Sequence, residues 1–226
     1  MLESSLSHKL QMESIYSFQR HIYDVSRKHY LLGRDRLLQD LAPPKDGAVL
    51  ELGCGTGRNL VIAANNHKSA NFYGLDISNE MLKSAQKLIH KHRLTNRISI
   101  AQGDATSFAP VELFGVEKFD RIYISYSLSM IPDWQGTLEQ AFLHLSDKGS
   151  IHIVDFGQQT ELPDVFRSIL TKWLKLFHVT PRAELFDYVR ELAKAKNRNF
   201  EFQKLYRDYA HYCVIGPKRL QQLSSS

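Results

Sequence analysis

VLELGCGTGRNL, residues 49–60, decides the fold: an apolar run is followed by three glycines at alternate positions and then by the start of a helical pattern. In an open α/β sheet, the turn from the first strand into the first helix presents backbone N–H groups and a helix N-terminus to a ligand. Gly53, Gly55 and Gly57 lie in that turn, where glycine permits positive φ and lets a ligand approach the main chain without meeting a Cβ atom. The stretch therefore predicts a ligand site at the end of the first strand.

Outward from this stretch, short apolar runs alternate with longer stretches of helical periodicity, a pattern typical of a parallel sheet with crossover helices. The expected strands occupy residues 48–53, 71–77, 98–104, 119–126, 149–156, 200–206 and 209–215. The expected helices lie near residues 57–67, 79–91, 110–115, 134–145, 163–177 and 181–196. Only Arg207 and Asp208 separate the last two strands, so these should pair as an antiparallel hairpin. The predicted fold class is α/β, with a doubly wound, seven-stranded, mostly parallel, Rossmann-like sheet that ends in a C-terminal antiparallel hairpin.

The length and composition favour one domain with additions. The 226 residues are 43% hydrophobic, which is enough for one sizeable core. We assign residues 43–226 to that domain and residues 1–42 to an N-terminal helical extension that caps the ligand site. The longest uncharged run, residues 122–132, is shorter than the roughly 20 residues that a membrane-spanning helix needs, and the first residues lack the pattern of a signal peptide. We expect a cytoplasmic protein.

The composition indicates no metal and no particular charged partner. Cys54 and Cys213 are far apart and offer neither a disulfide framework nor a zinc spacing. His90 and His92 would point to different sides of a helix, so we expect no metal. The net charge of +5 allows a nucleic acid, an anionic membrane surface or an acidic substrate, and it selects none of them.

Two acidic residues follow the glycine turn at the ends of the next two predicted strands. Asp76 lies nineteen residues beyond Gly57, where a carboxylate can bind both hydroxyls of a ribose. Asp104 ends the third strand and is suited to accept a hydrogen bond from an adenine amine. The G-x-G-x-G spacing differs from the G-x-G-x-x-G of dinucleotide sites, and Glu51 before the loop disfavours a pyrophosphate. The pattern fits an adenosine ligand without phosphates.

ELGCGTG, LDISNEML and GDA resemble the corresponding motifs of class I S-adenosylmethionine-dependent methyltransferases. The resemblance implies that S-adenosyl-L-methionine is the cofactor and that residues 43–226 form the methyltransferase domain. The implied cofactor-binding residues are Tyr23, Tyr30, Arg34, Glu51, Gly53, Gly55, Gly57, Asp76, Ile77, Met81, Asp104, Ala105 and Ser125.

The segment after the fourth predicted strand, SYSLSMIPDW at residues 125–134, is expected to face the methyl group. It lacks the Asn/Asp-Pro-Pro-aromatic motif of nucleic-acid amino-methyltransferases, so we expect no nucleic-acid partner. It offers hydroxyls and an aromatic ring but no strong base, which suits an amine that arrives partly deprotonated. We predict Tyr126 and Ser127 as catalytic residues, since a tyrosine ring can stabilise a migrating cation by roughly 1–2 kcal/mol. The alternative for Tyr126 is a packing aromatic at a strand end.

HIYDVSRKHYLLGRDRL, SYSLSMIPDW and VDFGQQTELPDVFRSILTKWLKLFHVTPR resemble the bacterial diacylglyceryl-homoserine N-methyltransferases of betaine-lipid synthesis, over about residues 20–216. The resemblance implies three methyl transfers to the amino group of a lipid substrate with a homoserine head group. Tyr23, Tyr30 and Arg34 would lie near one face of a helix over the cofactor, with Arg34 able to pair with a carboxylate. A methyltransferase for a soluble small molecule and a non-catalytic cofactor-binding subunit remain as alternatives.

The expected helix at residues 163–177 carries a continuous apolar stripe. Its members are Phe166, Ile169, Leu170, Trp173, Leu174 and Phe177. Arg167, Lys172 and Lys175 lie off the stripe. The stripe predicts either a helix packed on its own domain, the more usual case, or a lid or helix that faces an anionic membrane surface. The second case would make the protein peripheral on the inner membrane surface.

Overall fold

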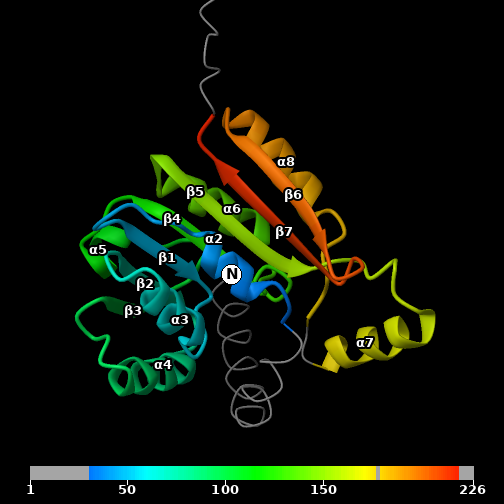
Figure 1. The fold of residues 1–226 in the computed structure, drawn as a ribbon, viewed down its shortest axis with the longest axis horizontal. Helices are drawn as coiled ribbons and strands as arrows, with labels where there is room; N and C mark the ends of the chain where they lie inside the picture. Colours follow the sequence, from blue (N-terminus) through cyan, green and yellow to red (C-terminus); the bar gives the residue numbers. More distant parts are fainter. Residues whose placement is uncertain (1–30, 177–178, 219–226) are drawn as a thin grey trace, which may run out of the picture.

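The computed structural model describes residues 31–176 and 179–218, and these residues form a single seven-stranded sheet with helices on both faces (Figure 1). The strands are β1 (Ala48–Leu52), β2 (Asn71–Asp76), β3 (Ile98–Gln102), β4 (Phe119–Ser125), β5 (Leu145–Phe156), β6 (Asn199–Leu205) and β7 (Ala210–Gly216). Their order is β3-β2-β1-β4-β5-β7-β6. Strands β1 to β5 pair in parallel, and β7 pairs antiparallel with both β5 and β6. The predicted fold class is confirmed.

Two hydrophobic cores lie on the two faces of the sheet, because successive strand residues point to opposite sides. The helices are α2 (Arg34–Asp40), α3 (Arg58–Asn66), α4 (Asn79–Lys91), α5 (Pro110–Phe114), α6 (Trp134–Leu143), α7 (Asp164–Leu176) and α8 (Leu185–Ala195). Val49 belongs to the core under α2, α3 and α4, whereas its neighbour Leu50 belongs to the core under α6 and α8. The chain thus builds the doubly wound arrangement from one apolar run per strand.

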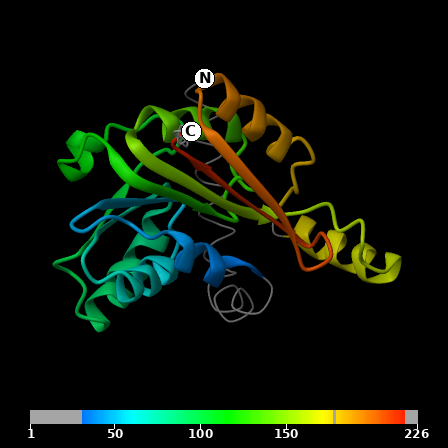
Figure 2. The same ribbon diagram turned by 45° about the horizontal axis from the view of Figure 1, so that its top comes forward.

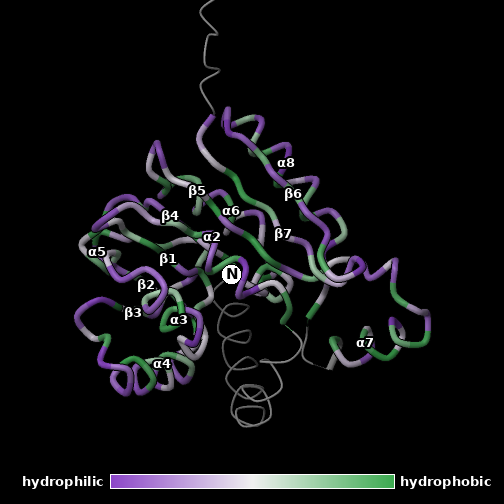
Figure 3. Tube along the Cα trace, in the orientation of Figure 1, coloured by the Kyte–Doolittle hydropathy of each residue, from purple (hydrophilic) through white to green (hydrophobic). Residues whose placement is uncertain are grey.

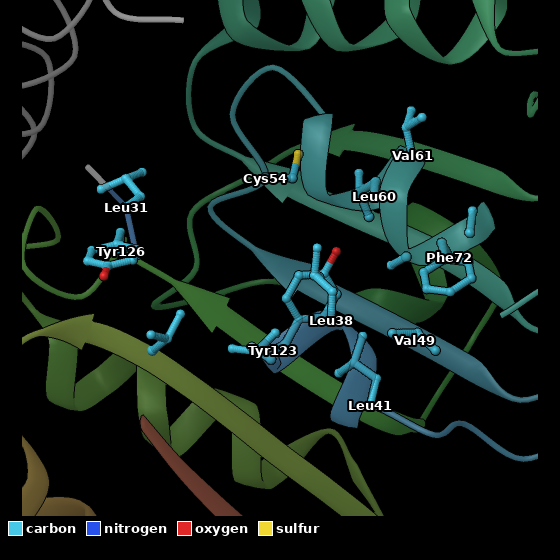
Figure 4. Close-up of a cluster of buried hydrophobic side chains, with 14 of the residues drawn as sticks. Leu31, Leu38, Leu41, Val49, Cys54, Leu60, Val61, Phe72, Tyr123 and Tyr126 are labelled. Carbon is cyan, nitrogen blue, oxygen red and sulfur yellow. The ribbon is translucent and has the colours of Figure 1, made fainter. Parts of the chain in front are cut away.

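Helix α2 is part of the main core. Leu37, Leu38 and Leu41 are fully buried, and Figure 4 shows Leu38 and Leu41 close to Val49 and Tyr123 of the sheet. The remainder of the predicted N-terminal cap, residues 1–30, lies outside the described residues. The domain boundary at residue 43 therefore stays a prediction.

Strand β3 ends at Gln102 instead of residue 104, so Asp104 lies just beyond the strand, and α8 begins at Leu185 instead of residue 181. Two other predicted boundaries were wrong for physical reasons. Strand β5 begins at Leu145 instead of residue 149, because Leu145 pairs with Phe119. Residues 146–149, which have a turn-like sequence, form an irregularity in the register before the pairing resumes. Leu205 pairs with Ala210, so four residues connect β6 to β7 instead of the expected two. Within that connection Tyr206, Arg207 and Asp208 all have positive φ, at 54°, 57° and 62°.

Helix α7 stands out from the sheet beyond the end of β5 in both Figure 1 and Figure 2. Within the two described ranges, no helix combines the length and the apolar character needed to cross a bilayer.

Candidate active site

The glycine turn after β1 has the conformation that its sequence predicts. Gly53, Gly55 and Gly57 have φ of 75°, 52° and 74°, which is the left-handed region that favours glycine. A Cβ atom on Gly53 would lie 2.7 Å from the Cβ of Ser127, and one on Gly57 would lie 2.9 Å from the Cβ of Ala85. These glycines thus permit the turn to pack closely against the loop after β4 and against α4.

Asp76 orders this turn from the end of β2. One carboxylate oxygen accepts a hydrogen bond from the Gly55 N–H at 2.7 Å, and the other accepts from the Ser78 N–H at 2.9 Å. A carboxylate offers about four acceptor positions, so the same side chain can shape the loop and receive ribose hydroxyls. The structure brings Asp76 and the glycine turn together as predicted.

The adjacent ends of β2 and β3 provide a surface that suits an adenine base. Ile77 is an exposed apolar side chain directly after Asp76, at 38% of its full surface, and Met81 is buried behind it at the start of α4. Asp104 is exposed and accepts hydrogen bonds from the N–H and hydroxyl of Thr106, at 2.9 and 2.7 Å. The partly exposed Ala105 follows it. An exposed apolar face beside an exposed carboxylate fits a base that stacks and donates through its amine.

Glu51 lies beneath the turn and not in the open. It is 1% exposed, and its carboxyl group accepts hydrogen bonds from the Asn59 amide at 2.8 Å and the Tyr123 hydroxyl at 3.0 Å. Burial raises the pKa of Glu51 to about 8, although the two hydrogen bonds lower it. The negative charge of Asp76 raises it further. Its observed partners link β1 to α3 and β4, and its predicted contact with the cofactor stays a prediction.

The loop after β4 touches the glycine turn. The Ser127 hydroxyl donates to the Gly53 carbonyl at 3.3 Å. The Ser125 hydroxyl is buried and has no hydrogen-bond partner among the described residues. A buried polar group without a partner costs free energy unless a ligand or water satisfies it. Ser125 is therefore well placed to contact a ligand that enters between the two loops.

Tyr126 is buried and occupied by structural contacts. Its hydroxyl donates to the Leu32 carbonyl at 2.6 Å, and its ring packs edge to face on Phe156 with centroids 4.7 Å apart. It is 1% exposed, and Figure 4 shows its ring beside Leu31. These contacts fasten the segment before α2 to the end of β4, as expected of a packing aromatic at a strand end; the catalytic role of Tyr126 and Ser127 stays a prediction.

Arg34 begins α2 and is 7% exposed. Its Nε donates to the Leu31 carbonyl at 3.1 Å. Its positive charge counteracts part of the rise that burial causes in the pKa of Glu51 and of Tyr126. Two other predicted residues on this side, Tyr23 and Tyr30, lie outside the described residues.

Sequence reasoning missed Asp155, at the end of β5. This residue is 1% exposed, and its carboxylate accepts hydrogen bonds from the N–H groups of Ser129 at 3.1 Å and Phe156 at 2.8 Å. Burial raises its pKa to about 6 against these hydrogen bonds. It holds the loop after β4 in place. The one signal in the sequence is a carboxylate that directly follows the apolar residues Ile153 and Val154 near the end of the strand.

A groove of about 670 Å³ lies between α7 and the loop that follows β5. Its walls include Gln158, Arg167 and Lys172. The groove begins just beyond the end of β5 and presents polar side chains there.

Comparison with known proteins identifies the family to which the chain is similar. The model of a family described as a methyltransferase domain matches residues 44–208. Demethylmenaquinone methyltransferase of Geobacillus sp. (strain WCH70) is 24% identical over 215 residues, which cover 92% of this chain and 85% of the relative. Aklanonic acid methyltransferase DauC of Streptomyces sp. (strain C5) is 31% identical over 134 residues, which cover 58% of this chain and 59% of the relative.

A solved structure of similar fold is phosphoethanolamine N-methyltransferase 2 of Haemonchus contortus in complex with S-adenosyl-L-methionine. It has a TM-score of 0.64 and 17% sequence identity, over 82% of this chain and 52% of that one. At this identity the likeness concerns the fold alone.

Proposed function

Because the chain belongs to the methyltransferase domain family, we propose that it transfers methyl groups to a small organic molecule. It is an S-adenosyl-L-methionine-dependent methyltransferase. The relatives are named for demethylmenaquinone, aklanonic acid and trans-aconitate, all of them small molecules. The segment at residues 125–134, without the motif of nucleic-acid amino-methyltransferases, also supports a small acceptor.

The first candidate acceptor is the amino group of diacylglyceryl-homoserine, which would be methylated three times to a betaine lipid. It is supported by the sequence resemblance over about residues 20–216. The observation that supports an amine as the methyl acceptor is the burial of the two carboxyl groups next to the loops. Glu51 and Asp155 are each 1% exposed and accept hydrogen bonds from neighbouring groups. Because these carboxyl groups are buried, they stabilise the loops and do not accept a proton from a substrate. An amine that loses its proton to water needs no such base.

The second candidate is a soluble small molecule. The alignment with demethylmenaquinone methyltransferase over 92% of this chain favours it. The names of the curated relatives agree better with this candidate than with the betaine lipid.

In both cases the chain's own residues divide the work in the same way. The ribose and adenine would be bound by the glycine turn, Asp76 and Asp104. The Ser125 hydroxyl would form a hydrogen bond with the ligand. Arg34 would hold a carboxylate, either of the cofactor or of a homoserine head group. When bound, S-adenosyl-L-methionine supplies a methyl group on a positively charged sulfur.

The test is incubation of the full chain with S-adenosyl-L-methionine and diacylglyceryl-homoserine, followed by mass detection of the lipid. The expected result is mono-, di- and trimethyl products with the wild type and with Asp147→Ala, an exposed aspartate in the bulge of β5, and none with Asp76→Ala. If methylated product forms only with soluble extracts and not with the lipid, the second candidate is the acceptor. Cofactor binding without any product would indicate a non-catalytic subunit.

A further inference from the structure

Helix α7 carries two adjacent apolar rows that differ in exposure. Residues four apart lie in one row along a helix, and the two rows are Val165, Ile169 and Trp173, here called the outer row, and Phe166, Leu170 and Leu174, the inner row. In the inner row Leu170 is 8% exposed and Leu174 1%, and Trp173 of the outer row packs against the same core, so the C-terminal half of α7 is fastened to the domain. Phe166, at the N-terminal end of the inner row, is 49% exposed. In the outer row Val165 is 74% exposed and Ile169 62%. The domain therefore covers only about half of the apolar surface of this helix.

The charge of α7 is biased towards positive. Its sequence has three basic residues, Arg167, Lys172 and Lys175, and one acidic residue, Asp164, which gives +2. Arg167 pairs with Asp164 at 2.8 Å. Lys172 belongs to the row that borders the outer row on its polar side, so a positive group accompanies the exposed apolar side chains.

The position of α7 leaves the outer row accessible. Figures 1 and 2 show the helix standing away from the sheet, and Figure 3 shows hydrophobic residues along it. The groove with Gln158, Arg167 and Lys172 in its walls separates α7 from the loop after β5.

We propose that the outer row of α7 docks the protein on the surface of an anionic lipid bilayer. A helix of 13 residues is too short to span a bilayer, whereas an apolar row flanked by basic residues is typical of a helix that lies in the interface. A second copy of the chain is a poorer occupant, because it would bring another helix with a charge of +2 against the first. This inference does not depend on which acceptor is methylated.

The experiment is co-sedimentation of the full chain with vesicles of phosphatidylcholine alone or mixed with phosphatidylglycerol, without any methyl acceptor. The wild type is expected to bind the anionic vesicles, and more weakly at high salt. Val165→Ser with Ile169→Ser should weaken binding by about tenfold or more, because two apolar side chains no longer enter the interface. Lys172→Gln should weaken it by about fivefold.

The matched control is Val111→Ser with Leu143→Ser, which removes side chains that are 57% and 56% exposed on α5 and α6. This variant should bind like the wild type, and all variants should keep their affinity for S-adenosyl-L-methionine, since none touches the cofactor site. The proposal is wrong if the wild type ignores anionic vesicles or if the α7 double variant binds as well as the control. It is also wrong if the wild type is a dimer that the α7 double variant converts to monomer.

Discussion

Glu51→Gln should remove a pH dependence of stability that the buried carboxyl imposes. Burial raises the pKa of Glu51 from its ordinary 4.5 to about 8 in the folded protein. The folded state therefore keeps a proton that the unfolded chain releases, so the stability is full below pH 4.5 and is lost as the pH rises to about 8. Each pKa unit corresponds to about 1.36 kcal/mol, so the whole interval is worth about 5 kcal/mol of unfolding free energy.

Two other buried groups titrate at lower pH and can be separated from Glu51. Burial raises the pKa of Asp155 to about 6, with the same sign of effect, so its contribution ends near pH 6. Burial lowers the pKa of His152 from 6.5 to about 3, which gives the opposite sign: stability rises with pH up to about 6.5. Between pH 6.5 and 8 only Glu51 of these three continues to titrate, and the expected loss is about 2 kcal/mol.

Urea unfolding of the ligand-free protein at pH 6.5 and 8 measures this difference. The wild type should lose about 2 kcal/mol between the two conditions, and Glu51→Gln should lose almost nothing. Asp155→Asn is the control, because it removes a buried carboxyl whose titration is mostly over at pH 6.5, and it should leave the wild-type loss nearly unchanged. If the wild type and Glu51→Gln lose the same unfolding free energy between pH 6.5 and 8, Glu51 is not protonated in the folded protein and the prediction is wrong.

Two further predictions concern single side chains. Asp76→Ala should weaken binding of S-adenosyl-L-methionine by about 1.5–3 kcal/mol in calorimetry, because it removes a charged acceptor for the ribose and releases the Gly55 N–H; an unchanged affinity in a folded variant would exclude Asp76 from the site. Tyr126→Phe should lower the unfolding free energy by about 1 kcal/mol, because the partly buried Leu32 carbonyl loses its donor, and it should still give the fully methylated product. Loss of methyl transfer at unchanged stability would instead assign the chemistry to the Tyr126 hydroxyl.

The sequence predicts the features that depend on local pattern. Strand ends follow from apolar runs, and parallel neighbours bring the residues after those runs to one edge of the sheet. The sequence alone therefore suffices to place Asp76 beside the glycine turn and Asp104 beyond the neighbouring end of β3. Contacts between distant residues leave no local signal. The Tyr126 hydroxyl meets a carbonyl 94 residues earlier, and Asp155 meets a backbone N–H 26 residues earlier. Each of these side chains has the sequence context of a strand residue, and packing alone assigns its partner.

The partial burial of α7 has the same origin. Its apolar stripe is continuous in sequence, and periodicity cannot say how much of it the domain covers. The structure divides the stripe because Leu170 and Leu174 reach the domain while Val165, Phe166 and Ile169 stay exposed. A helix that only packed on its domain would gain nothing from apolar residues in the second row, and polar residues there would avoid an exposed patch. The width of the stripe therefore argues that the outer row meets a surface beyond the domain itself.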